Sequence, residues 1–275
     1  MNLRAVTYKI SLNSSNIFNL RRNPTELKKL VFKSINQKHS QIFKKGKFQY
    51  AMQVIEDKQY NDKNIMTGRI IKYIAIDGSE KWLEKEQMII NIIEENSIIE
   101  KVYFVYEENS EYLFIEERSK LDIDIFKDAF AYIINYNNME LSIDLNPILH
   151  EEEINKRIKK IKKIVWAHFE IIPNNPDQRA WSMFETINER IGSTSSIYEF
   201  KNNDGLNYSE EIDELITDVN KGKSRRYLIG GYNEEDIYDE VRSHEFIKRS
   251  YRNVSPTDEG RKRGIWMIMK EVLDL

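Results

Sequence analysis

Residues 102–117 read VYFVYEENSEYLFIEE, and this stretch decides the class of fold. Two runs of aromatic and β-branched residues lie on either side of the turn-forming pair Asn109-Ser110. Such side chains pack well on a pleated sheet, and two runs around a polar turn are typical of an antiparallel hairpin. Asp122 and Asp124 then open a segment whose apolar residues recur at helical spacing, and acidic groups stabilise a helix N-terminus. The stretch therefore predicts a hairpin followed by an amphipathic helix.

The same mixture of strands and helices continues along the chain in both directions. Runs rich in β-branched and aromatic residues predict strands at 5–12, 47–57, 65–76, 139–148, 164–172, 196–200, 225–232 and 238–254. Helical spacing of apolar residues predicts helices from Glu26, at 150–163, 181–192 and 209–220, and after Thr257. We expect residues 84–95 to form a short helix or a loop. Hairpins mixed with helices indicate an α+β fold and not a doubly wound parallel sheet.

The domain organisation follows from the length and from one basic helix. A chain of 275 residues is long enough for one or two domains. Pro147 ends a predicted strand, and the helix 150–163 after it is acidic at its start and basic at its end. We therefore predict an N-terminal α+β domain at 1–149 and a C-terminal α+β domain at 150–275, with 150–163 as a linker helix. Each domain is expected to consist of antiparallel sheet with packed helices.

The composition excludes several classes of protein. The chain has no cysteine, which rules out disulfide scaffolds, thiolate zinc sites, iron–sulfur clusters and cysteine nucleophiles. A chain without cysteines needs no oxidising compartment, which is compatible with a reducing one such as the cytosol. The sequence shows no secretory leader and no apolar run of roughly 18 residues, so we expect a cytoplasmic protein without membrane insertion.

Catalytic motifs are incomplete in this sequence, so it does not indicate an enzyme. The four histidines show no metal-binding spacing, and they are His39, His150, His168 and His244. The carboxylates lack the arrangement that a magnesium-dependent nuclease requires. Gly230-Gly231 is predicted to form a bulge or a turn and not a phosphate loop. The four tryptophans are expected in the core rather than on a base-stacking surface. No cofactor and no metal site are predicted.

The distribution of charge is the most informative feature for function. The formal net charge is −3, yet the segment from Arg21 to Lys47 holds nine basic residues and one acid. Further basic stretches follow at 156–163 and 221–252. In the last of them, period-two alternation would place Arg242, His244, Lys248 and Arg252 on one face of a single strand. Such segregation allows a mildly acidic protein to present a phosphate-binding surface. The residues predicted to bind DNA are Arg21, Arg22, Lys44, Lys45, Lys47, Lys159, Lys163, Arg225, Arg226, Arg242, Lys248 and Arg252.

Several segments also resemble a known group of proteins. TGRIIKYIAID at 67–77, followed by Trp82, resembles the central signature of an uncharacterised bacterial phage-defence family. The hairpin at 102–117 and the late segments at 225–232 and 242–254 fit the same family. The order of elements is more loosely similar to that of RexA, the phage-exclusion protein of lambda lysogens. The resemblance includes no catalytic motif, and it implies an anti-phage role with DNA binding through a basic surface, as a homodimer.

Three functions remain open from the sequence. The first is a non-enzymatic, sequence-independent DNA-binding or sensing component of an anti-phage defence system of the abortive-infection type, gripping backbone phosphates with lysine and arginine. The second is a metal-dependent nuclease that acts as the effector. The third is an adaptor that recognises a phage protein or a partner subunit encoded in the same defence operon.

Overall fold

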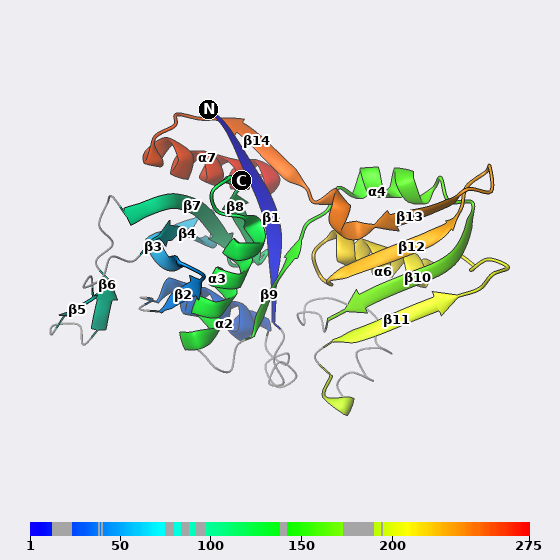
Figure 1. The fold of residues 1–275 in the computed structure, drawn as a ribbon, viewed down its shortest axis with the longest axis horizontal. Helices are drawn as coiled ribbons and strands as arrows, with labels where there is room; N and C mark the ends of the chain where they lie inside the picture. The colour runs from blue at the N-terminus through cyan, green and yellow to red at the C-terminus, as the bar shows by residue number, and fades with distance from the viewer. Residues whose placement is uncertain are drawn as a thin grey trace. The chain divides into compact units, whose positions relative to one another are not determined.

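The computed structural model describes residues 1–12, 24–37, 39, 41–74, 80–83, 88–91, 97–137, 142–172, 190–193 and 195–275. Within this part of the chain, five α-helices and two larger antiparallel sheets make up an α+β fold, as the sequence predicts. The helices are α2 (Pro24–Asn36), α3 (Ile123–Asn137), α4 (Glu151–Ile158), α6 (Glu210–Asn220) and α7 (Asp258–Val272). The ribbon in Figure 1 shows the elements with these labels.

The larger sheet has eight strands. Seven follow the order β14-β1-β8-β7-β4-β3-β2, and β9 pairs with β1 outside this path. The predicted hairpin is confirmed, because Phe104 of β7 lies opposite Ile115 of β8. The carboxylate of Glu107 accepts hydrogen bonds from the backbone N–H groups of Asn109 and Ser110 and so holds the turn. The strands are β1 (Asn2–Leu12), β2 (Ile42–Lys45), β3 (Phe48–Tyr60), β4 (Lys63–Tyr73), β7 (Ile98–Glu107), β8 (Tyr112–Glu116), β9 (Ile143–Pro147) and β14 (Arg249–Asn253).

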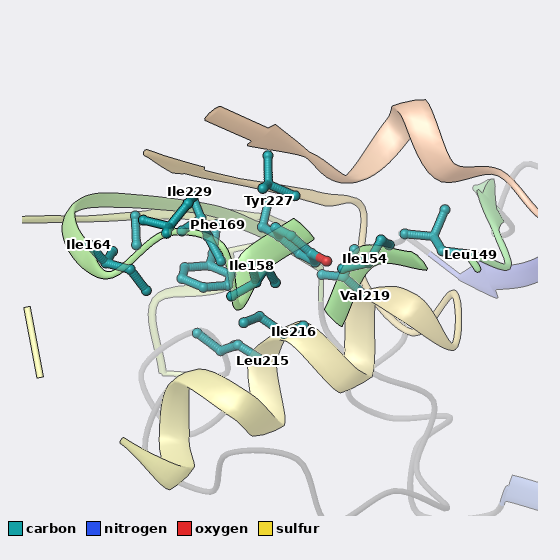
Figure 2. Packing of buried hydrophobic residues seen from close by; sticks show 13 residues of the cluster. Leu149, Ile154, Ile158, Ile164, Phe169, Leu215, Ile216, Val219, Tyr227 and Ile229 are labelled. Atoms are coloured by element: carbon teal, nitrogen blue, oxygen red, sulfur yellow. The ribbon is translucent and has the colours of Figure 1, made fainter. Parts of the chain in front are cut away.

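The smaller sheet has four strands in the order β11-β10-β12-β13. They are β10 (Lys163–Ile171), β11 (Ser196–Lys201), β12 (Arg226–Tyr232) and β13 (Tyr238–Arg242). Helices α4 and α6 cover one face, and Figure 2 shows the packing between them. Phe169, Tyr227 and Ile229 of the sheet meet Ile154 and Ile158 of α4 there. Two further short strands, β5 (Glu80–Leu83) and β6 (Met88–Asn91), pair with each other.

Contacts divide the chain into two compact units, and both are discontinuous in sequence. Unit 1 comprises Met1–Val6, Lys28–Ile143 and Arg249–Leu275, whereas unit 2 comprises Thr7–Leu27 and Asp144–Lys248. Strand β14 and helix α7 lie in the C-terminal half of the sequence, yet they belong to the same unit as residues 1–6. The domain boundary that we expected between residues 149 and 150 stays a prediction.

Three predicted elements differ from the structure. The helix expected at 150–163 ends at Ile158, because the chain turns there to bring Lys163 into β10. Segment 238–254 is not one strand: the 3₁₀ turn η2 (Ser243–Phe246) separates β13 from β14, which belong to different sheets. Segment 84–95 contains strand β6. The helix predicted at 181–192 lies almost wholly outside the described residues.

Within the described ranges, no helix combines the length and the apolar composition needed to cross a membrane.

Candidate nucleic-acid interface

A group of exposed positive charges lies where α4 turns into β10. Lys159 caps the helix, and the backbone N–H of Ile161 donates to the carbonyl oxygen of Ile158 at 2.9 Å. Ile158, Ile161 and Ile164 are buried in the core of unit 2. Because these isoleucines anchor the turn from within, the residues between them face solvent.

Four lysines of this segment have no carboxylate partner among the described residues. They are exposed, and we call them the lysine turn: Lys156, Lys159, Lys160 and Lys163. The two other cations of the segment are paired, Arg157 with Asp239 at 3.1 Å and Lys162 with Glu234 at 2.9 Å. The lysine turn is therefore a local excess of positive charge in a region where neighbouring cations are neutralised.

Three of the arginines predicted to bind DNA, Arg225, Arg226 and Arg242, lie at the opposite end of the four-stranded sheet. Arg226 of β12 is opposite Glu170 of β10, whereas Lys163 is opposite Tyr232. The two ends are six residues apart along β12, which corresponds to about 20 Å at the usual rise of a strand. The structure thus brings Arg225, Arg226 and Arg242 near one another, but it does not bring them to Lys159 and Lys163.

These arginines are occupied by carboxylates of the same unit. Arg225 donates to Glu170 at 2.7 Å and to Asp144 at 2.9 Å. Arg226 donates to Glu170 at 2.8 Å, and Arg242 pairs with Glu240 on its own strand at 2.7 Å. A phosphate would have to compete with these carboxylates for the guanidinium groups. The arginine end consequently offers much less free positive charge than its sequence indicates.

The ion pairs of Glu170 predict a pH dependence of stability. Burial raises the pKa of the Glu170 carboxyl, but hydrogen bonds and charge from Arg225 and Arg226 outweigh burial and hold the pKa below its ordinary value. A lowered pKa in the folded state adds stability that is present above the unfolded pKa and lost as the pH falls. We expect the wild-type free energy of unfolding to fall more steeply than that of Glu170→Gln below about pH 5.

Urea unfolding at a series of pH values measures this difference. Glu235→Gln is a matched control, since Glu235 is exposed and forms no ion pair with another described residue. That control should follow the wild-type curve. Parallel curves for the wild type and Glu170→Gln would contradict a stabilising role of the arginine pairs.

Unit 1 holds a second lysine-rich turn, between β2 and β3. Lys45 pairs with Asp128 at 3.2 Å, and the ammonium group of Lys47 lies 5.5 Å from the centre of the Phe48 ring. Lys44 is exposed and has no carboxylate partner in the ranges that are described. This turn presents fewer unpaired charges than the lysine turn of unit 2.

The remaining predicted DNA-binding residues are scattered. Arg252 of β14 pairs with Glu271 of α7 in unit 1. Lys248 follows η2 in unit 2, where its backbone N–H donates to the carbonyl of Ile148 at 2.9 Å. The expected single face of Arg242, His244, Lys248 and Arg252 is wrong, because η2 breaks the period-two alternation and the flanking strands join different sheets. Arg21 and Arg22 lie outside the described residues.

Across the described residues, no three His, Cys, Asp or Glu side chains come together in a way that could hold a metal ion. The Nε2–H of His39 donates to the carbonyl oxygen of Ile35 at 2.9 Å, and burial lowers the pKa of its imidazole. The nuclease hypothesis therefore has no candidate site in the part of the chain that is described.

The fold and this surface define an α+β protein with an exposed lysine-rich turn on a four-stranded antiparallel sheet. Residues 8–272 match the family model described as a domain of unknown function, DUF4747, and the chain belongs to this family. A search of curated proteins found no match.

Proposed function

We propose that this protein binds DNA without sequence specificity, holding backbone phosphates with the lysine turn. One observation carries the proposal: Lys156, Lys159, Lys160 and Lys163 are all exposed and unpaired among the described residues, within eight residues of chain. Polyanion binding depends on such free cations, because neutralised phosphates release their counterions. Lys159 and Lys163 belong to the set predicted from sequence, and the structure supplies the reason to favour them over the paired arginines.

The chemistry of the surface favours backbone contacts over base recognition. Sequence readout in the major groove relies largely on bidentate pairs, often from arginine. Arg157, Arg225 and Arg226 already donate to carboxylates, whereas lysine is a flexible point charge that suits single phosphate oxygens. A role in anti-phage defence, a homodimer and a partner subunit from a defence operon are further parts of the proposal, and they rest on the family resemblance.

A DNA-binding assay with two matched variants tests this proposal. We expect the quadruple change Lys156→Gln, Lys159→Gln, Lys160→Gln and Lys163→Gln to weaken binding of a mixed-sequence duplex by about 100-fold at low salt. The control replaces four lysines that already pair with carboxylates, namely Lys58, Lys127, Lys201 and Lys262. Both variants change the net charge equally. Equal loss of affinity in both would show that position does not matter and would contradict the proposal, as would no binding by the wild type.

The adaptor remains a second candidate, and the open face of the four-stranded sheet favours it. Ile197 is 65% exposed and Tyr238 is 49% exposed on strands of this sheet. Trp166, which we expected in the core, is only partly buried and donates to Glu199 at 2.9 Å. The cations of the face, Lys201, Arg226 and Arg242, all pair with carboxylates. A stable protein complex that resists salt and is lost in Tyr238→Glu would favour the adaptor over DNA binding.

A further inference from the structure

A cavity of about 490 Å³ lies directly beside the lysine turn. Its walls come from α4, the turn itself, the start of β10, the loop before α6, and α6. The residues that line it are Asn155, Ile158, Lys159, Ile161, Lys162, Ile164, Leu206, Tyr208 and Asp213. All of them belong to unit 2. Its volume falls within the usual range of small-molecule sites.

The cavity has an apolar floor. Ile158, Ile161 and Ile164 are buried members of the core of unit 2, and Leu206 packs against the same cluster. Figure 2 shows Ile164 at the edge of this core and Ile158 nearer its middle. The backbone N–H of Leu206 donates to the carbonyl of Ile164 at 2.6 Å and fixes the loop against β10. A flat, apolar group of a ligand would bury its surface against this floor.

The rim of the cavity is polar and carries both signs of charge. The hydroxyl of Tyr208 donates to Asp213 at 2.8 Å, which fixes the orientation of the half-exposed Tyr208 ring. Asn155 supplies an amide on the α4 side. Lys159 is exposed without a carboxylate partner among the described residues, whereas Lys162 pairs with Glu234. The one free cation that lines the cavity in this part of the structure is therefore a residue of the lysine turn.

We infer that this cavity binds one nucleoside phosphate, with the base on the isoleucine floor and the phosphate at Lys159. A nucleobase has two apolar faces that suit the floor and the Tyr208 ring, and aromatic side chains are common partners of unstacked bases. Its edge carries hydrogen-bond donors and acceptors that match the carboxylate of Asp213 and the amide of Asn155. The inference rests on the proposed function, since Lys159 is shared with the backbone-binding surface.

A nucleoside phosphate in this cavity could have two origins. The nucleoside phosphate is either a free nucleotide or one unit of a strand whose neighbouring phosphates lie on Lys156, Lys160 and Lys163. In the second case the cavity would favour single-stranded over duplex DNA, because a base must leave its stack to enter.

Calorimetric titration of the full chain with 5′-mononucleotides, an oligo-dT strand, a duplex and decanoate separates these cases. We expect nucleotide or oligo-dT binding to weaken about tenfold or more in Leu206→Trp, which fills the cavity and leaves every lysine in place. Duplex binding by this variant should stay within about twofold of wild type. Lys160→Gln should weaken duplex binding and leave mononucleotide binding within about twofold of wild type, because Lys160 does not line the cavity. If the cavity holds one unit of a strand, the same change should also weaken oligo-dT binding.

Methyl NMR of the isoleucines provides a readout on the wild-type protein, in case Leu206→Trp does not fold. Nucleotide should shift the methyl signals of Ile158, Ile161 and Ile164. Intact duplex binding with no nucleotide or oligo-dT binding would overturn the cavity inference and leave the proposed function standing. Tighter binding of decanoate than of any nucleotide would also overturn it. Nucleotide binding without duplex binding would support the cavity and contradict the backbone-binding proposal.

Discussion

Replacing Arg261 with alanine should lower the free energy of unfolding by about 3–5 kcal/mol, because it leaves a buried carboxylate without its main partner. Arg261 lies in the first turn of α7 and donates to both carboxylate oxygens of Glu116 on β8, at 2.7 and 2.8 Å. The two side chains are 8% and 1% exposed. A further bond joins Arg261 to the carbonyl of Lys101 on β7. This one side chain thus fastens α7 to two strands of unit 1.

Urea unfolding measures the loss of unfolding free energy in Arg261→Ala, and two other variants serve as comparisons. Lys262→Ala removes the surface pair with Glu259 on the same helix and should cost less than about 1 kcal/mol. The double change Arg261→Met and Glu116→Leu should be more stable than Arg261→Ala, because it removes both charges together. A loss below about 1 kcal/mol for Arg261→Ala would show that the buried pair does not hold the helix.

Replacing Gly231 with alanine is expected to destabilise unit 2 by about 3 kcal/mol, at the upper end of the range for overpacking. A Cβ atom at Gly231 would lie 2.1 Å from the carbonyl oxygen of Lys163 and 2.9 Å from the Cα of Ile164. Both are backbone atoms of the paired strand β10, so β12 and β10 would have to separate. The register of this pair already shifts between Ile164 and Trp166.

The neighbouring glycine is the matched control. A Cβ atom at Gly230 would meet the hydroxyl of Tyr238 at 2.1 Å, which is the far end of a partly exposed side chain that can move aside. Gly230→Ala should therefore cost much less than Gly231→Ala. Thermal and urea unfolding of both variants test the difference, and equal losses would contradict the assignment of Gly231 as the point of close approach.

The spacing of apolar residues predicted most helices and strands, because this spacing depends only on residues close together in the sequence. The hairpin around Asn109-Ser110 is an example, since its strands pair with near neighbours in sequence. The end of α4 at Ile158 was not predictable in this way, because the lysines after it are as compatible with a helix as with a turn. What stops the helix is distant: Lys162 donates its backbone N–H to the carbonyl of Tyr232, a residue of β12. The close contact of Gly231 with Lys163 has the same long-range origin.

For the candidate site, too, some features could be predicted from nearby residues in the sequence and others depend on residues far away in it. Counting charges along the chain directs attention to the basic segment at 156–163. It cannot tell a free cation from a paired one, because the partners of Arg225 are Asp144 and Glu170, far away in sequence. The cavity also escapes a sequence pattern, since its lining comes from segments between Asn155 and Asp213 that fold together.

The salt dependence of duplex binding tests the central claim most directly. If the four residues of the lysine turn each contact a phosphate, the slope of log affinity against log salt should be less steep by about 3 to 4 in the quadruple lysine-to-glutamine variant than in the wild type. The variant with four paired lysines replaced should retain the wild-type slope. Identical slopes for the wild type and the lysine-turn variant would contradict the claim that this turn holds the DNA backbone.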